Sequence, residues 1–164
     1  MNELARALAG DSYAAPPAHI LEGLGDEFVH RPLALVPHTI YQELWHIAFW
    51  QQLTLDWVEG IETPYPAQPS NGFPGAVETD GESWEQLCQR FLEASQRAAA
   101  ITGDAEKMEQ MIRCPSRPGA PVRSMSVREQ LESLAAHNAY HLGRIVLLRQ
   151  FGQRWPPPSG GFSW

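Results

Sequence analysis

Cysteine is scarce in this sequence: only Cys88 and Cys114 occur among 164 residues. A small secreted scaffold held by several disulfides is therefore excluded. In a reducing compartment we expect both residues to stay thiols, although the sequence leaves a disulfide between them open. Cys88 shares the apolar face of a predicted helix with Trp84, Leu87 and Phe91, so we expect it to be a small core residue.

The sequence also lacks an N-terminal run resembling a signal peptide and any stretch suited to span a membrane. By default this predicts a cytoplasmic location. Basic residues are few, with 12 Lys and Arg against 19 Asp and Glu and a formal net charge of −7. Such a surface repels phosphate backbones and anionic lipids. We therefore expect a small-molecule substrate of unknown identity and neither nucleic acid nor membrane as a partner.

Several catalytic motifs are missing. There is no Gly-x-Ser-x-Gly elbow, no phosphate-binding glycine loop, and no histidine near either cysteine in the chain. Asn138 follows a histidine where the metalloprotease motif His-Glu-x-x-His needs its glutamate. The segment from Glu43 to His46 fits one Glu-x-x-His element of di-iron bundles, but Leu134 and Asn138 leave its second copy absent. A metal site here is expected to be mononuclear.

Alternation typical of strands is absent as well, whereas three long helices are indicated. Each begins with a capping box, a Ser or Thr followed three residues later by Glu or Gln. Each stops at a glycine, which accepts the left-handed conformation common just past a helix end. The caps are Thr39 with Gln42, Ser83 with Gln86 and Ser126 with Glu129, and the glycines are Gly60, Gly103 and Gly152. The predicted helices span residues 40–59, 84–102 and 127–151.

Residues 1–8 and 17–24 are interpreted as the two parts of a broken first helix, the second with a proline near its first turn. Together with the three long helices they predict an all-α fold, a four-helix bundle formed by a single domain over residues 1–151. Residues 152–164 form a tail rich in proline and glycine. Its aromatic residues favour packing on the same domain: Trp155, Phe162 and Trp164.

Two long proline-rich connections separate the predicted helices. They cover residues 61–82 and 103–125, and a short helix is expected near 104–112. Loops of this length in a small domain are commonly functional covers when they carry aromatic residues and are stiffened by proline. We therefore expect them to cover the open side of the candidate site.

That site is indicated by three histidines. His137 and His141 lie four residues apart, which places them on one face of a helix, roughly 6 Å apart along its axis. His46 lies in the apolar helix 40–59. The remaining histidines fall in predicted loops or near helix starts and are set aside: His19, His30 and His38.

Each of the three histidines could instead be a core residue bonded to a neighbouring carbonyl or water. Three imidazoles on two apolar helices favour a divalent metal held by three histidines, with one coordination position open.

The segment His137-Asn-Ala-Tyr-His-Leu-Gly-Arg-Ile-Val is the most specific motif, supported by Pro37-His-Thr-Ile-Tyr, by His46 and by the start Ser83-Trp84. With these motifs the chain resembles the DinB-like superfamily (DinB/YfiT type) of metal-binding four-helix bundles. The resemblance implies an up-down-down-up bundle, commonly a homodimer. It also implies one divalent metal ion per chain, zinc or nickel, held by His46, His137 and His141.

Members of that superfamily include thiol-dependent S-transferases and isomerases, together with many of unknown activity, so the fold does not settle the function. We expect a metal-dependent enzyme that activates water or a low-molecular-weight thiol, a hydrolase or a thiol S-transferase. The alternative is a non-catalytic metal-binding or small-ligand-binding dimeric module.

Glu43 and Arg144 are further candidates. Glu43 lies one turn before His46 and is expected either to accept an imidazole N–H and carry a proton, or only to cap its helix. Arg144 stands where the family often has Gln. It is expected either to bind an anionic substrate group or to form a structural salt bridge.

The helix 40–59 has two apolar stripes, and a monomeric four-helix bundle buries only one. This predicts a homodimer with Trp45, Phe49 and Trp57 as exposed anchors.

Overall fold

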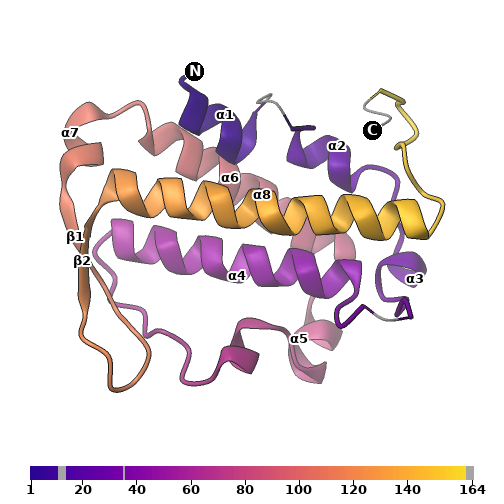
Figure 1. Cartoon of the computed structure of the whole chain (residues 1–164), viewed down its shortest axis with the longest axis horizontal. Coiled ribbons are helices and arrows are strands. Elements are labelled where there is room, and N and C mark those ends of the chain that lie inside the picture. Colours follow the sequence, from indigo (N-terminus) through magenta and orange to yellow (C-terminus); the bar gives the residue numbers. More distant parts are fainter. Residues whose placement is uncertain (11–13, 35, 162–164) are drawn as a thin grey trace.

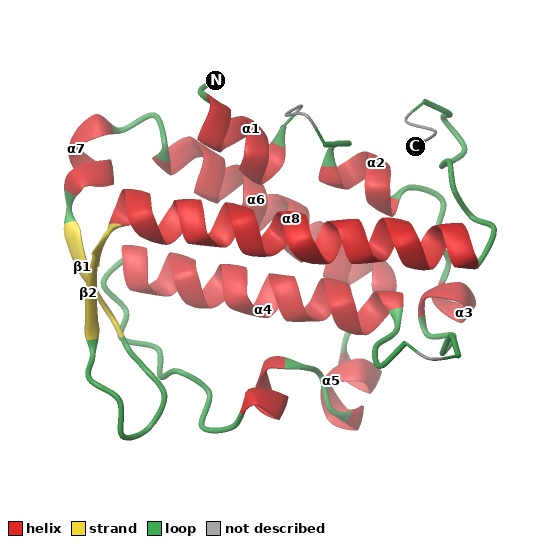
Figure 2. Ribbon diagram, in the orientation of Figure 1, coloured by secondary structure: helices red, strands yellow, loops and turns green. Residues whose placement is uncertain are grey.

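The computed structural model describes residues 1–10, 14–34 and 36–161. Helices dominate, and a short hairpin lies at one end of the longest ones (Figures 1 and 2). In chain order the elements are α1 (Glu3–Ala9), α2 (Pro17–Leu21), α3 (Asp26–Val29), α4 (Ile40–Val58), η1 (Pro69–Gly72), α5 (Ala76–Gly81), α6 (Trp84–Ile101), α7 (Ala105–Glu109), β1 (Met111–Cys114), β2 (Arg123–Ser126) and α8 (Val127–Phe151). None of the described helices has the length and apolar character needed to cross a membrane.

The three predicted long helices are confirmed as α4, α6 and α8, each ending within one residue of its predicted end. All three capping boxes form. In each, the side chain of Thr39, Ser83 or Ser126 accepts from the backbone three residues on, and the Gln or Glu there reaches back to the cap. These reciprocal bonds satisfy amides that the first helical turn leaves unpaired, which explains why the starts could be located so closely.

The helix-ending glycines behave differently from one another. Gly60 adopts the left-handed conformation, with φ of +83°. Gly152 has φ of −84° at the end of α8, and Gly103 is not among the positive-φ residues, so the left-handed prediction was wrong for both. At Gly152 the reason for glycine is space, because a Cβ there would overlap the ring of Phe28.

The N-terminal segment is broken, as predicted, and α1 and α2 are its two helical parts. The short helix α3 follows and was not predicted. The side chain of Asn2 caps α1 by accepting from the amide of Ala5, and its Nδ2 donates to the carbonyl of Thr102 at 3.0 Å. This bond fastens the start of α1 to the end of α6.

The structure corrects the prediction for residues 103–125. The short helix is confirmed as α7, but Met111–Cys114 and Arg123–Ser126 then pair as an antiparallel hairpin, so the prediction that no strand occurs was wrong. Each strand is only four residues long, and β2 has no buried residue to mark its inner face. Cys114 is accordingly buried on a strand and not in a loop.

The helices α4 and α8 lie side by side (Figure 1). They run in opposite directions, since Glu43 near the start of α4 pairs with Arg144, whereas Thr54 near its end bonds to Gln130. The third long helix, α6, runs in the same direction as α4, because Gln51 bonds to the carbonyl of Phe91 and Glu59 pairs with Arg97.

The apolar core forms two clusters at the two ends of these helices. One cluster lies around Leu55 and Leu131, and the other around Leu44 and Ile145. Polar side chains, including fully buried Gln51, lie near the middle of α4 and α8 between the clusters. The half-buried Trp155 of the tail packs against the second cluster, whereas Phe162 and Trp164 lie outside the described residues.

The three aromatic residues expected as exposed dimer anchors are not equivalent. Trp57 is only 3% exposed and its Nε1 donates to the carbonyl of Thr63 at 2.8 Å, so its prediction as an exposed anchor was wrong. Trp45 and Phe49 are half-buried and stack on each other, with ring centroids 5.3 Å apart.

Candidate metal centre

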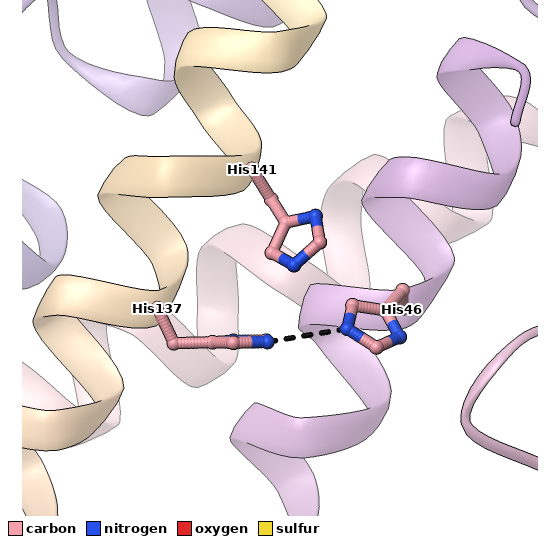
Figure 3. Close-up of side chains that lie close together, drawn as sticks. All are labelled: His46, His137 and His141. Carbon is pink, nitrogen blue, oxygen red and sulfur yellow. Dashed lines mark hydrogen bonds between the residues drawn. The ribbon is translucent and has the colours of Figure 1, made fainter. Parts of the chain in front are cut away.

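The structure brings His46, His137 and His141 together near the middle of the molecule. His46 extends from α4, and the other two extend from successive turns of α8 toward it (Figure 3). One ligand atom from each residue can be chosen so that all three atoms lie within 4.8 Å of one another. His46 and His141 are each 8% exposed, and His137 is half-buried. No sequence-predicted member of the triad is missing from the cluster.

Hydrogen bonds fix the proton positions of two of these rings. Nδ1 of His46 lies 2.7 Å from the carbonyl oxygen of Gly72, and Nδ1 of His141 lies 2.6 Å from Oε2 of Glu43. A carbonyl or carboxylate oxygen can only accept, so each neutral ring carries its proton on Nδ1. Each therefore presents a lone pair on Nε2.

The third ring has a different arrangement. Nε2 of His137 lies 3.1 Å from Nε2 of His46, while Nδ1 of His137 is buried without a well-formed hydrogen bond among the described residues. Because Nε2 of His46 already holds a lone pair, the hydrogen bond between the rings requires the proton of His137 to sit on its Nε2. If a cation binds Nε2 of His137, the proton of that ring moves to Nδ1.

The donor set fits a divalent first-row metal. With Zn–N bonds of about 2.0–2.1 Å, two ligands of one tetrahedral zinc ion lie about 3.3 Å apart. The two Nε2 atoms that face each other are 3.1 Å apart. Neutral imidazole nitrogen suits zinc, nickel or copper, whereas calcium and magnesium require oxygen ligands.

Burial keeps two of the rings neutral. It is the largest cause lowering the pKa of both His46 and His137 to about 4, and the nearby His141 lowers both further. Near neutral pH both rings are therefore uncharged, which is the form that binds metal.

Glu43 is fully buried and joins two partners from α8. Its Oε2 accepts from His141, and its Oε1 accepts from Nε and Nη2 of Arg144 at 2.9 and 2.8 Å. Burial opposes ionisation, but the hydrogen bonds from His141 and Arg144 outweigh it and lower the pKa of Glu43. The expected imidazole acceptor is thus in place, and the simple capping alternative fails because Glu43 is buried.

Residues from two connections cover the cluster. Phe73, which follows η1, stacks on His46 with ring centroids 4.2 Å apart. His38 stacks on the Phe73 ring at 3.9 Å, next to the start of α4. This agrees with the expected covering role of residues 61–82. The local sequence pattern did not identify His38 as part of the site, although its motif, Pro37-His-Thr-Ile-Tyr, marked the position.

A pocket of about 350 Å³ adjoins the cluster on the side of His46 and His137. The remaining lining residues come from α4, α8, β2 and residue 65 of the connection that follows α4. They are Trp50, Thr54, Trp57, Tyr65, Arg123, Gln130, Ser133 and Leu134. The histidine cluster is therefore reachable by a small molecule.

Neither cysteine provides a competing nucleophile. Both are free, and burial raises the pKa of Cys88 to about 12 and also raises that of Cys114. A thiol with a raised pKa holds little of the reactive thiolate at neutral pH. Cys114 Sγ instead donates weakly to Oε1 of Gln130.

Comparison with protein families gives one match over most of the chain. A family model of the DinB superfamily matches residues 18–145. The matched region includes all of α4, the hairpin and α8 as far as Ile145, and therefore all three clustered histidines. A search of curated proteins finds no significant match.

Proposed function

The chain belongs to the DinB superfamily, and we propose that it binds one divalent metal ion, zinc or nickel, through His46, His137 and His141. The observation that carries this proposal is the convergence of three imidazoles, two of which already hold their protons on Nδ1. Within the proposal, α1 and α2 together count as the first helix of an up-down-down-up bundle. The parallel α4 and α6 and the antiparallel α8 support that topology.

The function supported best by this site is that of a metal-dependent enzyme. A cation held by three histidines would lower the pKa of a coordinated water or low-molecular-weight thiol, because such a site leaves a coordination position open. Glu43 holds the proton of His141 on Nδ1 and so keeps Nε2 available. Phe73 excludes water from one face of His46, and the adjoining pocket admits the substrate from another side.

The metal site is tested by elemental analysis of protein purified without an affinity tag. We expect about one equivalent of zinc or nickel per chain, and almost none in a His141→Ala variant. His30→Ala is the matched control, because His30 stacks on Tyr41 outside the cluster. Full metal occupancy in the His141→Ala variant would refute the ligand assignment.

Turnover assays then distinguish the reaction classes. Low-molecular-weight thiols supplied with an electrophile test for an S-transferase, and panels of esters and amides test for a hydrolase. Activity is expected to vanish on chelation, to return with added metal, and to persist in Cys88→Ala and Cys114→Ala variants. Activity that survives complete metal removal would contradict a metal-dependent enzyme, and a metal-loaded protein inactive toward every substrate would favour the non-catalytic binding module.

The homodimer remains part of the proposal, with Trp45 and Phe49 as its anchors. The two stacked rings lie half-buried beside a hollow lined by Phe73 and Pro74. Sedimentation at micromolar concentration is expected to give a dimer for the wild type and a shift toward monomer for Phe49→Ser. A strictly monomeric wild type would refute this part.

A further inference from the structure

The pocket beside the histidine cluster has an uneven distribution of charge. Among the described residues, its lining contains one basic side chain besides the two histidines, that of Arg123, and no Asp or Glu. The chain as a whole carries a formal charge of −7. A pocket that is locally positive in an acidic protein favours an anionic ligand over a cationic one.

Arg123 also differs from the neighbouring arginine of the same hairpin. Arg113 on β1 pairs with Glu62 at 3.2 Å. Arg123 on β2 is exposed and has no acidic partner within 4.0 Å in the described part of the chain. A guanidinium group that no carboxylate of the protein neutralises can bind a carboxylate of a ligand through two parallel hydrogen bonds.

The body of the pocket is aromatic. Trp50 packs against Tyr65 with ring centroids 5.1 Å apart, and its ring lies 6.2 Å from that of His46 and 6.4 Å from that of His137. Trp57 adds a third ring whose N–H is already bonded to the carbonyl of Thr63. These walls favour a flat or compact apolar group over a strongly hydrated one.

We propose that this pocket binds a small organic acid, a carboxylate carried on an aromatic or compact apolar body. The carboxylate pairs with Arg123, and the body lies against Trp50 and Tyr65 with its far end toward His46 and His137. A volume of about 350 Å³ limits the ligand to small molecules. The inference rests on the proposed function, because it names the substrate class of the same centre.

The test compares phenylacetate with phenylacetamide, two probes of nearly equal shape that differ in charge. Calorimetric or NMR titrations use the full-length protein in its metal-free form, so that coordination of the carboxylate to a metal makes no contribution. We expect phenylacetate to bind the wild type about threefold more tightly than phenylacetamide, because Arg123 is exposed and water screens an exposed ion pair.

Two variants locate the anion. Arg123→Gln is expected to weaken phenylacetate binding about threefold, to the level of phenylacetamide, and to leave phenylacetamide binding unchanged. Arg113→Gln, on the facing strand, is the matched control and is expected to keep the wild-type preference. Circular dichroism of both variants verifies that neither substitution in the hairpin has unfolded the protein.

Equal affinity of the wild type for the two probes, no binding of either, or an unchanged preference in Arg123→Gln would overturn the inference. Metal content measured on separate as-purified samples keeps this result apart from the proposed function. Anion preference lost with Arg123 in a protein that never binds zinc or nickel would refute the metal centre and leave the pocket assignment standing. One equivalent of metal without anion preference would refute the pocket assignment and leave the metal centre standing.

Discussion

Two polar clusters lie next to each other between α4 and α8, and they use their atoms in opposite ways. In the first cluster, the Gln51 side chain accepts from Nδ2 of Asn138 at 2.7 Å and donates to the Phe91 carbonyl at 2.9 Å and to Ser95. Both polar atoms of the Gln51 side chain are thus bonded within the protein, whereas Oδ1 of Asn138 is buried without a well-formed hydrogen bond among the described residues. In the second cluster, three imidazoles direct nitrogen atoms at one another, and their protein partners occupy the opposite ring edge of only His46 and His141.

This difference separates a structural polar cluster from a functional one. The Gln51 amide, bonded at both of its polar atoms, holds helices in register and leaves nothing for a ligand. Imidazoles whose Nδ1 atoms are bonded outward leave their Nε2 lone pairs facing inward, which is unfavourable unless a proton or cation lies between them. The neighbouring residues His137 and Asn138 therefore serve different purposes on one helix.

The largest expected effect comes from breaking the amide cluster. Gln51→Leu leaves the Asn138 amide and the Phe91 carbonyl without their partner, so we expect the free energy of unfolding to fall by about 2–3 kcal/mol. Metal content is expected to stay at about one equivalent. His137→Ala is the matched variant in the other cluster and should lose the metal while changing the metal-free unfolding free energy by less than about 1 kcal/mol. Denaturant titration measures the unfolding free energy of both proteins, and elemental analysis measures their metal content. A Gln51→Leu protein that loses its metal would contradict the division into a structural and a functional cluster.

The part of this arrangement that the sequence predicted is local. Capping boxes placed the starts of α4, α6 and α8 because their reciprocal bonds involve residues only three apart. The i, i+4 spacing of His137 and His141 placed both rings on one face for the same reason.

The features that the sequence did not predict depend on contacts between distant segments. The hairpin pairs Cys114 with Arg123 across a proline-rich turn, and β2 lacks any alternation of its own. The stacking of His38 on Phe73 joins residues 35 positions apart, which no periodicity within one helix could reveal. Burial of Glu43 likewise became evident only when α8 was packed against α4.

A second effect sharpens the role of Glu43. Glu43→Gln keeps the size of the side chain but removes the charge that holds the Nδ1 proton of His141, so we expect the Kd for zinc to rise about tenfold. Zinc titration against a competing chelator measures it. Glu82→Gln is a suitable control, because Glu82 pairs with Arg90 away from the triad. Unchanged zinc affinity in Glu43→Gln would show that this carboxylate does not support the ligand.

The pH dependence of zinc binding tests how the triad is charged. Burial lowers the pKa of His46 and His137 to about 4, so neither ring must release a proton when metal binds between pH 7 and pH 5. Because the pKa of both rings is lowered, the neutral form that binds metal is present above about pH 4 and is lost as the pH falls through that value. We expect log Kd to change by no more than one unit per unit of pH between 7 and 5, hence by at most about tenfold per pH unit, and to steepen near pH 4. Zinc titrations at several pH values measure the slope, and a slope near three at pH 6 would contradict neutral, buried ligands.

The smallest effect is expected at Arg144, for which the sequence left two roles open. The guanidinium bonds to Glu43 and lies 5.7 Å from the ring of Tyr140, and its side chain is 30% exposed. Since exposed or half-exposed pairs contribute about 0–1 kcal/mol, Arg144→Gln is expected to raise the Kd for zinc by less than about fivefold. If its role is structural, Arg144→Gln leaves phenylacetate affinity unchanged and lowers stability slightly, and Arg144→Lys restores only part of that stability, because an ammonium group cannot offer two parallel donors to one carboxylate. A loss of phenylacetate affinity of about threefold or more in Arg144→Gln would instead assign the anion to Arg144 and would refute its assignment to Arg123.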